Sequence, residues 1–276
     1  MRAIHVNSFA PLFAKHGENA KPKVEKFDLY NMVLSALTWR KKNGEILLVC
    51  DRASADYYKA LGISVIWNGI KPLIPADLEG INPRMFWAAA KLFALRDTPA
   101  PVVMLDTDFI VWKKLNLSCD IIAAHREELY HNIYPDIDYF QMNPDYIFSE
   151  KFDYDVLPLN TAFLYLPDED FKQYYVGMAF DFMKSALDVP DELCYMVYAE
   201  QRMLALCAES LKQSVKTLLD KDKLFEKQDN FTHLWGEKQA MRDDPMREKS
   251  FNERCAARIR RDYNEFEFVI DLIEKS

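Results

Sequence analysis

Residues 101–112 read Pro-Val-Val-Met-Leu-Asp-Thr-Asp-Phe-Ile-Val-Trp, two aspartates set between two apolar runs. The run 102–105 predicts a strand that is buried on both faces. In an extended chain Asp106 and Asp108 would project to the same face, roughly 6.5 Å apart along the strand. Paired carboxylates at the end of a parallel strand can hold Mg²⁺ or Mn²⁺, which commonly bridge to substrate phosphates. The alternative is an acidic loop that closes a strand.

The chain before this stretch alternates apolar runs with helical patterns. Strands are expected at 4–8, 46–50, 64–67 and 102–105, and helices at 24–42, 53–61 and 83–96. This alternation predicts an α/β fold with a mainly parallel, twisted sheet flanked by helices. Asn7 and Ser8 end the first strand and Asp51 follows the second. We expect all three to bind substrate, because open α/β sheets bind ligands at the carboxyl ends of their strands.

The chain after residue 120 is less regular. Residues 125–156 are rich in tyrosine and phenylalanine and form an irregular lobe, which either holds a substrate or packs onto the sheet. A strand is expected at 157–166, followed by helices at 168–187, 191–212 and 247–261.

Composition excludes several classes of function. Lys and Arg number 35 against 43 Asp and Glu, a net charge of −8, which argues against a nucleic-acid partner. None of the seven glycines is spaced Gly-x-Gly, which excludes a dinucleotide fingerprint. The five cysteines include no Cys-x-x-Cys pair, and no apolar run approaches the ~18 residues of a spanning helix. We therefore expect a cytoplasmic protein without a transmembrane segment.

Four segments in order resemble motifs of GT-A-fold glycosyltransferases, in particular of family-8-like, sugar-nucleotide-dependent members. The Asp-x-Asp stretch resembles their metal motif, and residues 157–166 resemble their Asn-Ser/Ala-Gly strand. Residues 199–204 resemble their Asp-Gln pair before a helix, and residues 231–238 their His-x-x-Gly-x-x-Lys segment. The chain departs from these patterns in three places: Ala162 replaces Gly, Glu200 replaces Asp, and Lys238 comes one residue early.

The resemblance implies a metal-dependent hexosyltransferase that retains configuration and uses a UDP- or GDP-sugar with a saccharide or lipid-linked acceptor. It implies one GT-A-like domain over 1–276, with a Rossmann-like nucleotide-binding half (1–120), a donor-sugar and acceptor half (121–246) and a helical tail (247–276). The roles it implies are Mn²⁺ or Mg²⁺ binding by Asp106, Asp108 and His233, catalysis by Glu200 and Gln201, and substrate binding by Lys91, Asn160, Gly236 and Lys238.

Each of these side chains also has a structural alternative. Asn160 could satisfy backbone groups at a sheet edge, and Glu200 with Gln201 could form the solvated face of a helix. His233 could be a hydrogen-bonded core histidine, and Lys91 an exposed helix lysine.

Two other functions remain open from the sequence. One is a GT-A-like module that binds a nucleotide or glycan without turnover. The other is a phosphohydrolase of the haloacid-dehalogenase type, although its aspartate motif normally follows the first strand. The basic run 247–261 could also rest on the inner face of an anionic membrane, but its interleaved glutamates favour a solvated helix.

Overall fold

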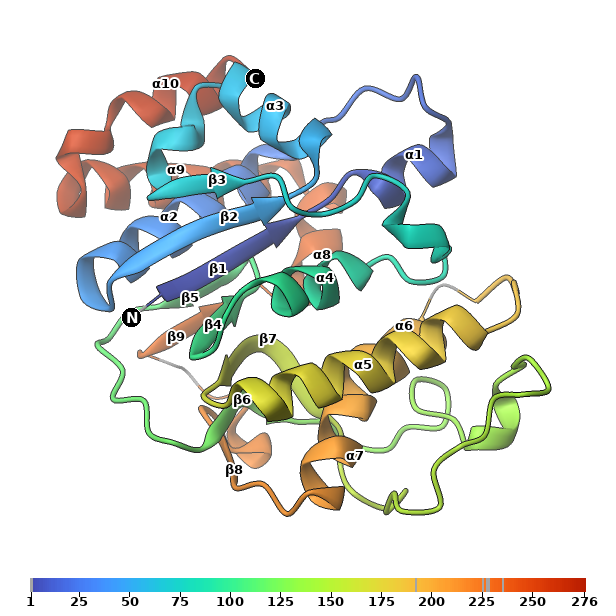
Figure 1. Ribbon diagram of the computed structural model, residues 1–276. Helices are drawn as coiled ribbons and strands as arrows, with labels where there is room; N and C mark the ends of the chain where they lie inside the picture. The colour runs from blue at the N-terminus through green and yellow to red at the C-terminus, as the bar shows by residue number, and fades with distance from the viewer. Residues whose placement is uncertain (1, 192, 225, 227–228, 235) are drawn as a thin grey trace.

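The computed structural model is built on a seven-stranded sheet in the order β3-β2-β1-β4-β7-β6-β8 (Figure 1). It describes residues 2–191, 193–224, 226, 229–234 and 236–276. The strands of this sheet are β1 (Arg2–Asn7), β2 (Glu45–Cys50), β3 (Gly69–Lys71), β4 (Val102–Leu105), β6 (Ile121–Arg126), β7 (Leu159–Leu166) and β8 (Val215–Thr217). Within this sheet β7 runs against its neighbours β4 and β6, whereas the other pairs are parallel. The predicted α/β class with a mainly parallel sheet is therefore confirmed.

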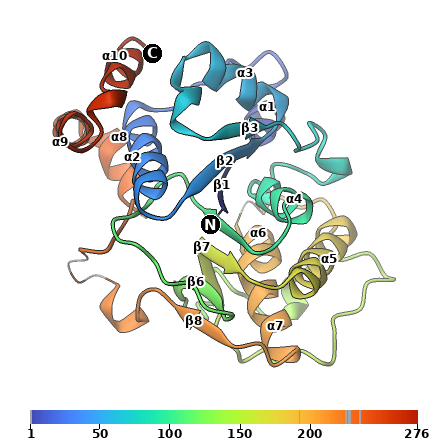
Figure 2. The ribbon, with the colours of Figure 1, turned by 60° about the vertical axis from the view of Figure 1, so that its left-hand side comes forward.

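Helices cover both faces of the sheet. They are α1 (Ala10–His16), α2 (Lys26–Lys42), α3 (Arg52–Ala60), α4 (Ala89–Asp97), α5 (Glu169–Ser185), α6 (Cys194–Val197), α7 (Met203–Ser210), α8 (Glu237–Asp243), α9 (Pro245–Asp262) and α10 (Phe268–Glu274). Figure 2 shows α2 and α9 on one side of the sheet and α4 and α5 on the other. Along β4, Met104 belongs to the core under α4 and α5, and Leu105 to the core under α2. The 102–105 run is apolar throughout because each of its faces is buried.

Three expected elements differ in the structure. The strand expected at 64–67 is a 3₁₀-helix, η1 (Ile63–Ile66), and β3 follows it. Ile63 and Ile66 are both fully buried, and this i, i+3 spacing puts two side chains on one face of a 3₁₀ turn rather than alternating them as in a strand. The helix expected at 83–96 begins at Ala89 as α4. The helix expected at 191–212 is interrupted by a π-helical turn, η4 (Tyr198–Arg202), between α6 and α7.

The aromatic segment between β6 and β7 mainly packs onto neighbouring helices. The ring of Phe140 lies 5.3 Å from Phe182, 5.0 Å from Tyr195 and 4.6 Å from Tyr198, measured between centroids. Such contacts add to the burial of apolar area. The packing alternative therefore describes Phe140, while Tyr134 of the same segment lines the cavity described below.

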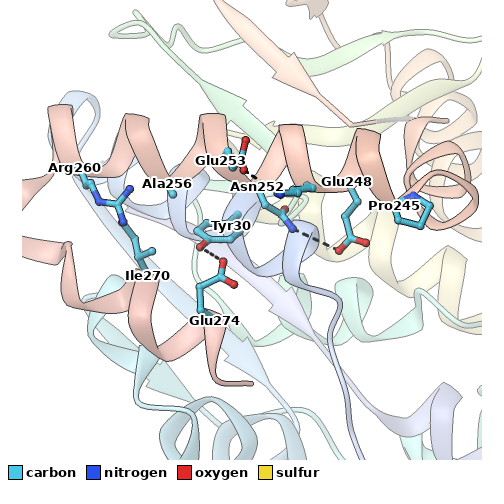
Figure 3. Close-up of a pocket in the computed structure, with 10 residues that line it drawn as sticks. Tyr30, Pro245, Glu248, Asn252, Glu253, Ala256, Arg260, Ile270 and Glu274 are labelled. Atoms are coloured by element: carbon cyan, nitrogen blue, oxygen red, sulfur yellow. Dashed lines mark hydrogen bonds and ion pairs between the residues drawn. The ribbon is translucent and has the colours of Figure 1, made fainter.

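The carboxyl-terminal helices pack against α2. A pocket of about 450 Å³ lies between α2, α9 and α10, and in it Tyr30 donates a hydrogen bond of 2.6 Å to Glu274. Figure 3 shows the side chains that line this pocket. The basic residues of α9 pair with nearby acids: Arg258 with Asp262 at 3.0 Å, and Arg260 with Glu267 at 3.1 Å. None of the described helices combines the length and hydropathy needed to cross a bilayer.

A second, two-stranded sheet joins β5 (Phe109–Val111) to β9 (Phe231–His233). Its position is fixed through His5, whose Nδ1 accepts a 3.1 Å hydrogen bond from Trp67. The proton of His5 is therefore on Nε2, which donates to Ser35 at 3.0 Å, and Ser35 donates to the carbonyl of Phe109 at 2.6 Å. Burial lowers the pKa of His5 to about 3, so the imidazole is neutral. This buried chain of hydrogen bonds holds β5 directly after Asp108.

Candidate functional site

Asp106 and Asp108 lie in the tight turn that connects β4 to β5. The amide of Asp106 donates to the carbonyl of Ala162 at 2.8 Å, continuing the β4–β7 pairing, and the amide of Phe109 donates back to the Asp106 carbonyl at 3.0 Å. The two aspartates are therefore in a turn, and not in the extended conformation expected from their spacing. The turn still directs both carboxylates into one cavity.

His233 is brought to the aspartates by β9. The antiparallel pairing of β5 and β9 places His233 opposite Phe109, and His233 Nε2 lies 3.8 Å from Asp108 Oδ1. One ligand atom from each of Asp106, Asp108 and His233 lies within 4.8 Å of the other two. Burial lowers the pKa of His233 and outweighs the two aspartates, which raise it. A neutral imidazole can bind a metal ion.

Each aspartate is also paired with a lysine. Lys238 Nζ lies 2.9 Å from Asp108 Oδ2, and Lys91 Nζ lies 2.6 Å from Asp106 Oδ1. Burial would raise the pKa of Asp108, but Lys238 and His233 hold it below its usual value. Burial would lower the pKa of Lys91, but the nearby carboxylates outweigh it and raise the pKa. Because only 17% of the Lys91 side chain is exposed, the alternative of an exposed helix lysine is wrong.

A second carboxylate contacts each lysine from its other side. Asp28, in the first turn of α2, lies 3.1 Å from Lys238, and Glu200 lies 2.9 Å from Lys91. Burial raises the pKa of Asp28, and Lys238 partly offsets this. The sequence did not single out Asp28: its place in a helix carries no sign that it meets a segment more than two hundred positions later.

Glu200 and Gln201 come from the π-helical turn η4. Glu200 accepts a 2.5 Å hydrogen bond from Thr161, and Gln201 Oε1 accepts one of 2.5 Å from Tyr134. The π turn inserts a residue into the helix, a feature frequent at functional sites. Only 3% of the Glu200 side chain is exposed, so a solvated helix face is not its environment.

Asn160 lies in β7 and pairs with His125 of β6, beyond the last pair between β7 and β4, Phe163 with Leu105. The alternative of a side chain that satisfies backbone groups at a sheet edge therefore stays open. Its Nδ2 donates to Glu127 Oε1 at 2.8 Å, and its Oδ1 accepts from the amide of Ala162 at 3.0 Å. Glu127 is a second site residue that the sequence analysis missed, since it follows a strand, β6, that was not expected.

These side chains line one cavity of about 440 Å³, within the ~300–1,000 Å³ typical of small-molecule sites. The lining consists of Val6, Trp87, Lys91, Asp106, Thr107, Asp108, Glu127, Ile133, Tyr134, Asn160, Thr161, Ala162, Leu193, Val197, Glu200, Gln201, His233 and Lys238. Four carboxylates and two ammonium groups give this lining a net charge of −2 when His233 is neutral. The cavity is therefore suited to a cation and repels an unaccompanied diphosphate.

Four predicted site residues lie outside this lining. Asp51 caps α3, its Oδ1 accepting from the amide of Ser54 and its Oδ2 from the hydroxyl of Ser8, each at 2.7 Å. Asn7 accepts from the Ser54 hydroxyl at 2.9 Å. Gly236 has φ +75° and is the N-cap of α8, and among the described residues other than its chain neighbours no heavy atom lies within 4 Å of where a Cβ would be. Substrate binding by Asn7, Ser8, Asp51 and Gly236 stays a prediction; Trp235 of the same motif lies outside the described residues.

Comparison with known proteins gives a family and a set of structures. The model of a family of unknown function (DUF6734) matches residues 23–269. No curated protein matches the sequence. Similar solved structures are transferases: the PaToxG glycosyltransferase (11% identity, 76% of this chain, 69% of that chain, TM-score 0.41), mouse xyloside xylosyltransferase 1 in its apo form (13%, 79%, 84%, 0.38), and the CTP:phosphocholine cytidylyltransferase of Streptococcus pneumoniae (9%, 89%, 98%, 0.42). These similarities are modest, and the chemistry of this chain follows from its own site residues.

Proposed function

The chain belongs to DUF6734, a family of unknown function, and we propose that it is a metal-dependent glycosyltransferase that takes its sugar from a nucleotide-diphosphate donor. The main support is the convergence of Asp106, Asp108, His233 and Lys238 on one cavity, although the two pairs are far apart in the sequence. Two carboxylates, an imidazole and an adjacent ammonium are the groups needed to bind a divalent ion together with a diphosphate.

The three ligands suit Mn²⁺ or Mg²⁺. Carboxylate oxygen is the preferred ligand of both ions, and imidazole nitrogen is compatible with Mn²⁺. In an octahedral site with bonds of roughly 2.1 Å, ligand atoms lie about 3.0 Å apart when adjacent and about 4.2 Å apart when opposite, so atoms within 4.8 Å of one another would move closer together around the ion. When bound, the ion would stabilise the negative charge that develops on the departing diphosphate.

Three other side chains of the cavity would contact different parts of the donor. Lys238, 34% exposed and lining the cavity, would donate hydrogen bonds to the diphosphate, most strongly as its charge grows in the transition state. Glu200 places a buried negative charge near the sugar, where the anomeric carbon becomes positive. The side-chain oxygen of Gln201 already accepts a hydrogen bond from Tyr134. Its amide N–H groups would therefore donate hydrogen bonds to the sugar nucleotide or to the acceptor.

The finer details of this proposal come from the motif resemblance. We propose a UDP- or GDP-hexose donor, a saccharide or lipid-linked acceptor, and retention of configuration with Glu200 and Gln201 at the anomeric carbon. Asn160 would contact the donor sugar, and Lys91 would add positive charge to the nucleotide site. The hydrolase alternative loses support because Asp106 follows β4, the fourth strand along the chain.

The test measures metal-dependent nucleotide binding and turnover. At 100 times its dissociation constant, UDP or GDP with Mn²⁺ should stabilise the protein by about 2.7 kcal/mol. For 276 residues this corresponds to a rise in Tm of about 5 °C. Asp108→Asn should abolish the rise, whereas Asp120→Asn, which breaks a surface pair with Lys216, should keep it. An undiminished rise in Asp108→Asn would contradict the site.

Release of UDP or GDP from a donor panel, with and without Mn²⁺, separates the functional alternatives. Only a transferase should release the nucleotide diphosphate from its donor. Metal-dependent binding without release would favour the non-catalytic module instead.

A further inference from the structure

The two metal-binding aspartates share an arrangement that their predicted roles do not require. Each is paired with a lysine, and each lysine is held from its other side by a second carboxylate. In one of these carboxylate–lysine–carboxylate groups, Lys91 lies 2.6 Å from Asp106 and 2.9 Å from Glu200. In the other, Lys238 bridges Asp108 at 2.9 Å and Asp28 at 3.1 Å.

The two carboxylate–lysine–carboxylate groups differ in where the second carboxylate lies. Glu200 lines the cavity and belongs to the proposed catalytic residues. Asp28 is outside the lining, on the first turn of α2, and its described ion-pair partner is Lys238. Lys238 is the charged group that acts most strongly on Asp28, and Asp108 and Arg242 act on it more weakly.

An ion at Asp108 and an ammonium on the same carboxylate compete. Asp108 Oδ1 faces His233, and its Oδ2 carries Lys238. A divalent ion that binds Asp108 brings two positive charges next to this ammonium, so the Lys238–Asp108 contact must weaken as the ion enters. Asp28 already contacts the same ammonium and lies on a helix whose following residues are packed into the core.

We propose that Asp28 is a positioning residue. When a divalent ion binds Asp108, the ammonium group of Lys238 leaves Asp108 and keeps its ion pair with Asp28. Asp28 thus holds this ammonium beside the ion, where a diphosphate binds. The inference rests on the metal site of the proposed function. Lys238 thus neutralises Asp108 before the ion arrives and binds the anionic donor afterwards. Asp28 supplies the carboxylate that makes this exchange possible without moving the lysine into solvent.

The test measures Mn²⁺ binding to metal-free protein without nucleotide, by the loss of the electron paramagnetic resonance signal of free Mn²⁺. Lys238→Met removes the competing cation and should tighten Mn²⁺ binding by about tenfold, the equivalent of one charge-assisted contact. Asp28→Asn leaves Lys238 with Asp108 alone and should weaken Mn²⁺ binding by about threefold to tenfold. The two variants should therefore change the affinity in opposite directions.

Three further variants sharpen the result. The double variant Asp28→Asn/Lys238→Met should bind Mn²⁺ nearly as Lys238→Met does, because without the lysine only the weaker direct interaction between Asp28 and Asp108 remains. Lys238→Arg keeps the competing positive charge and should therefore not tighten Mn²⁺ binding as Lys238→Met does. Lys26→Met is the matched control: it removes a lysine two positions from Asp28 that pairs with Glu274 at 3.1 Å, and it should leave Mn²⁺ binding unchanged.

The outcomes separate this inference from the proposed function. If Lys238→Met and Asp28→Asn both weaken Mn²⁺ binding, or neither changes it, the exchange is refuted while the metal site stands. If neither the wild type nor any of these variants binds Mn²⁺, the metal site and the exchange are both refuted. If the opposite shifts appear but no donor releases UDP or GDP, the transferase is refuted and the role of Asp28 is supported.

Discussion

Breaking the buried ion pair between Lys91 and Glu200 should destabilise the protein measurably even without a ligand. Glu200→Gln keeps the shape of the side chain but removes its charge, while Lys91 retains Asp106 at 2.6 Å. Loss of one partner of a fully buried pair costs about 3–5 kcal/mol, and the remaining aspartate should reduce this to about 2 kcal/mol. With an unfolding entropy of about 2.1 cal/mol/K per residue, the Tm of this 276-residue chain should fall by about 3–4 °C.

Lys91→Met leaves two carboxylates without their shared cation and should cost more, about 3–5 kcal/mol. The decisive quantity is the coupling free energy in a double-mutant cycle with Glu200→Gln, measured by urea unfolding in the presence of a chelator. We expect a coupling of at least about 1 kcal/mol. A matched control is Glu79→Gln, which breaks a more exposed 2.7 Å pair with Arg96 and should cost less than about 1 kcal/mol. Coupling indistinguishable from zero would refute the buried pair.

Three further outcomes are expected. Because the pKa of His5 falls from 6.5 to about 3 on folding, the unfolded state binds more protons between these values. Stability should therefore fall as the pH drops below 6.5, by up to about 1.4 kcal/mol per pH unit, and urea titrations of His5→Gln should lack this part of the slope. Gln201→Ala should lower kcat by about a hundredfold with little change in nucleotide affinity. Tyr134→Phe, which removes the hydrogen bond to the Gln201 oxygen, should lower kcat less. A loss of nucleotide affinity as large as the loss of kcat would contradict either prediction. His233→Ala should weaken Mn²⁺ binding by about tenfold or more while the metal-free Tm changes little, whereas a purely structural histidine would show the reverse.

Features decided by local pattern could be predicted from the sequence. The apolar run before Asp106 identified β4, because a strand covered on both faces needs an apolar side chain at every position. The acids after it marked the carboxyl edge of the sheet, and the order of the motifs linked them to His233 and Lys238. The structure brings Asp106, Asp108 and His233 within reach of one ion.

Features decided by tertiary contact could not be predicted. β9 is a strand only because it pairs with β5, and its three residues carry too little pattern to indicate this alone. The π turn depends on how one helix packs, and it decides that Glu200 and Gln201 both face the cavity. Asp28 was read correctly as part of a helix, but its meeting with Lys238 depends on how distant parts of the chain pack.

The pairing of β5 with β9 also determines when the site forms during synthesis. A ribosome that adds about 5–20 residues per second needs roughly 1–4 s to go from Thr217, the end of β8, to Lys238. All strands of the large sheet have been made before this interval, but α9 and α10, which complete the core on the α2 face, are made after it. The ion site and the core that covers α2 are therefore both completed by the last part of the chain, so Asp106 and Asp108 are made long before the residues that join them in the site.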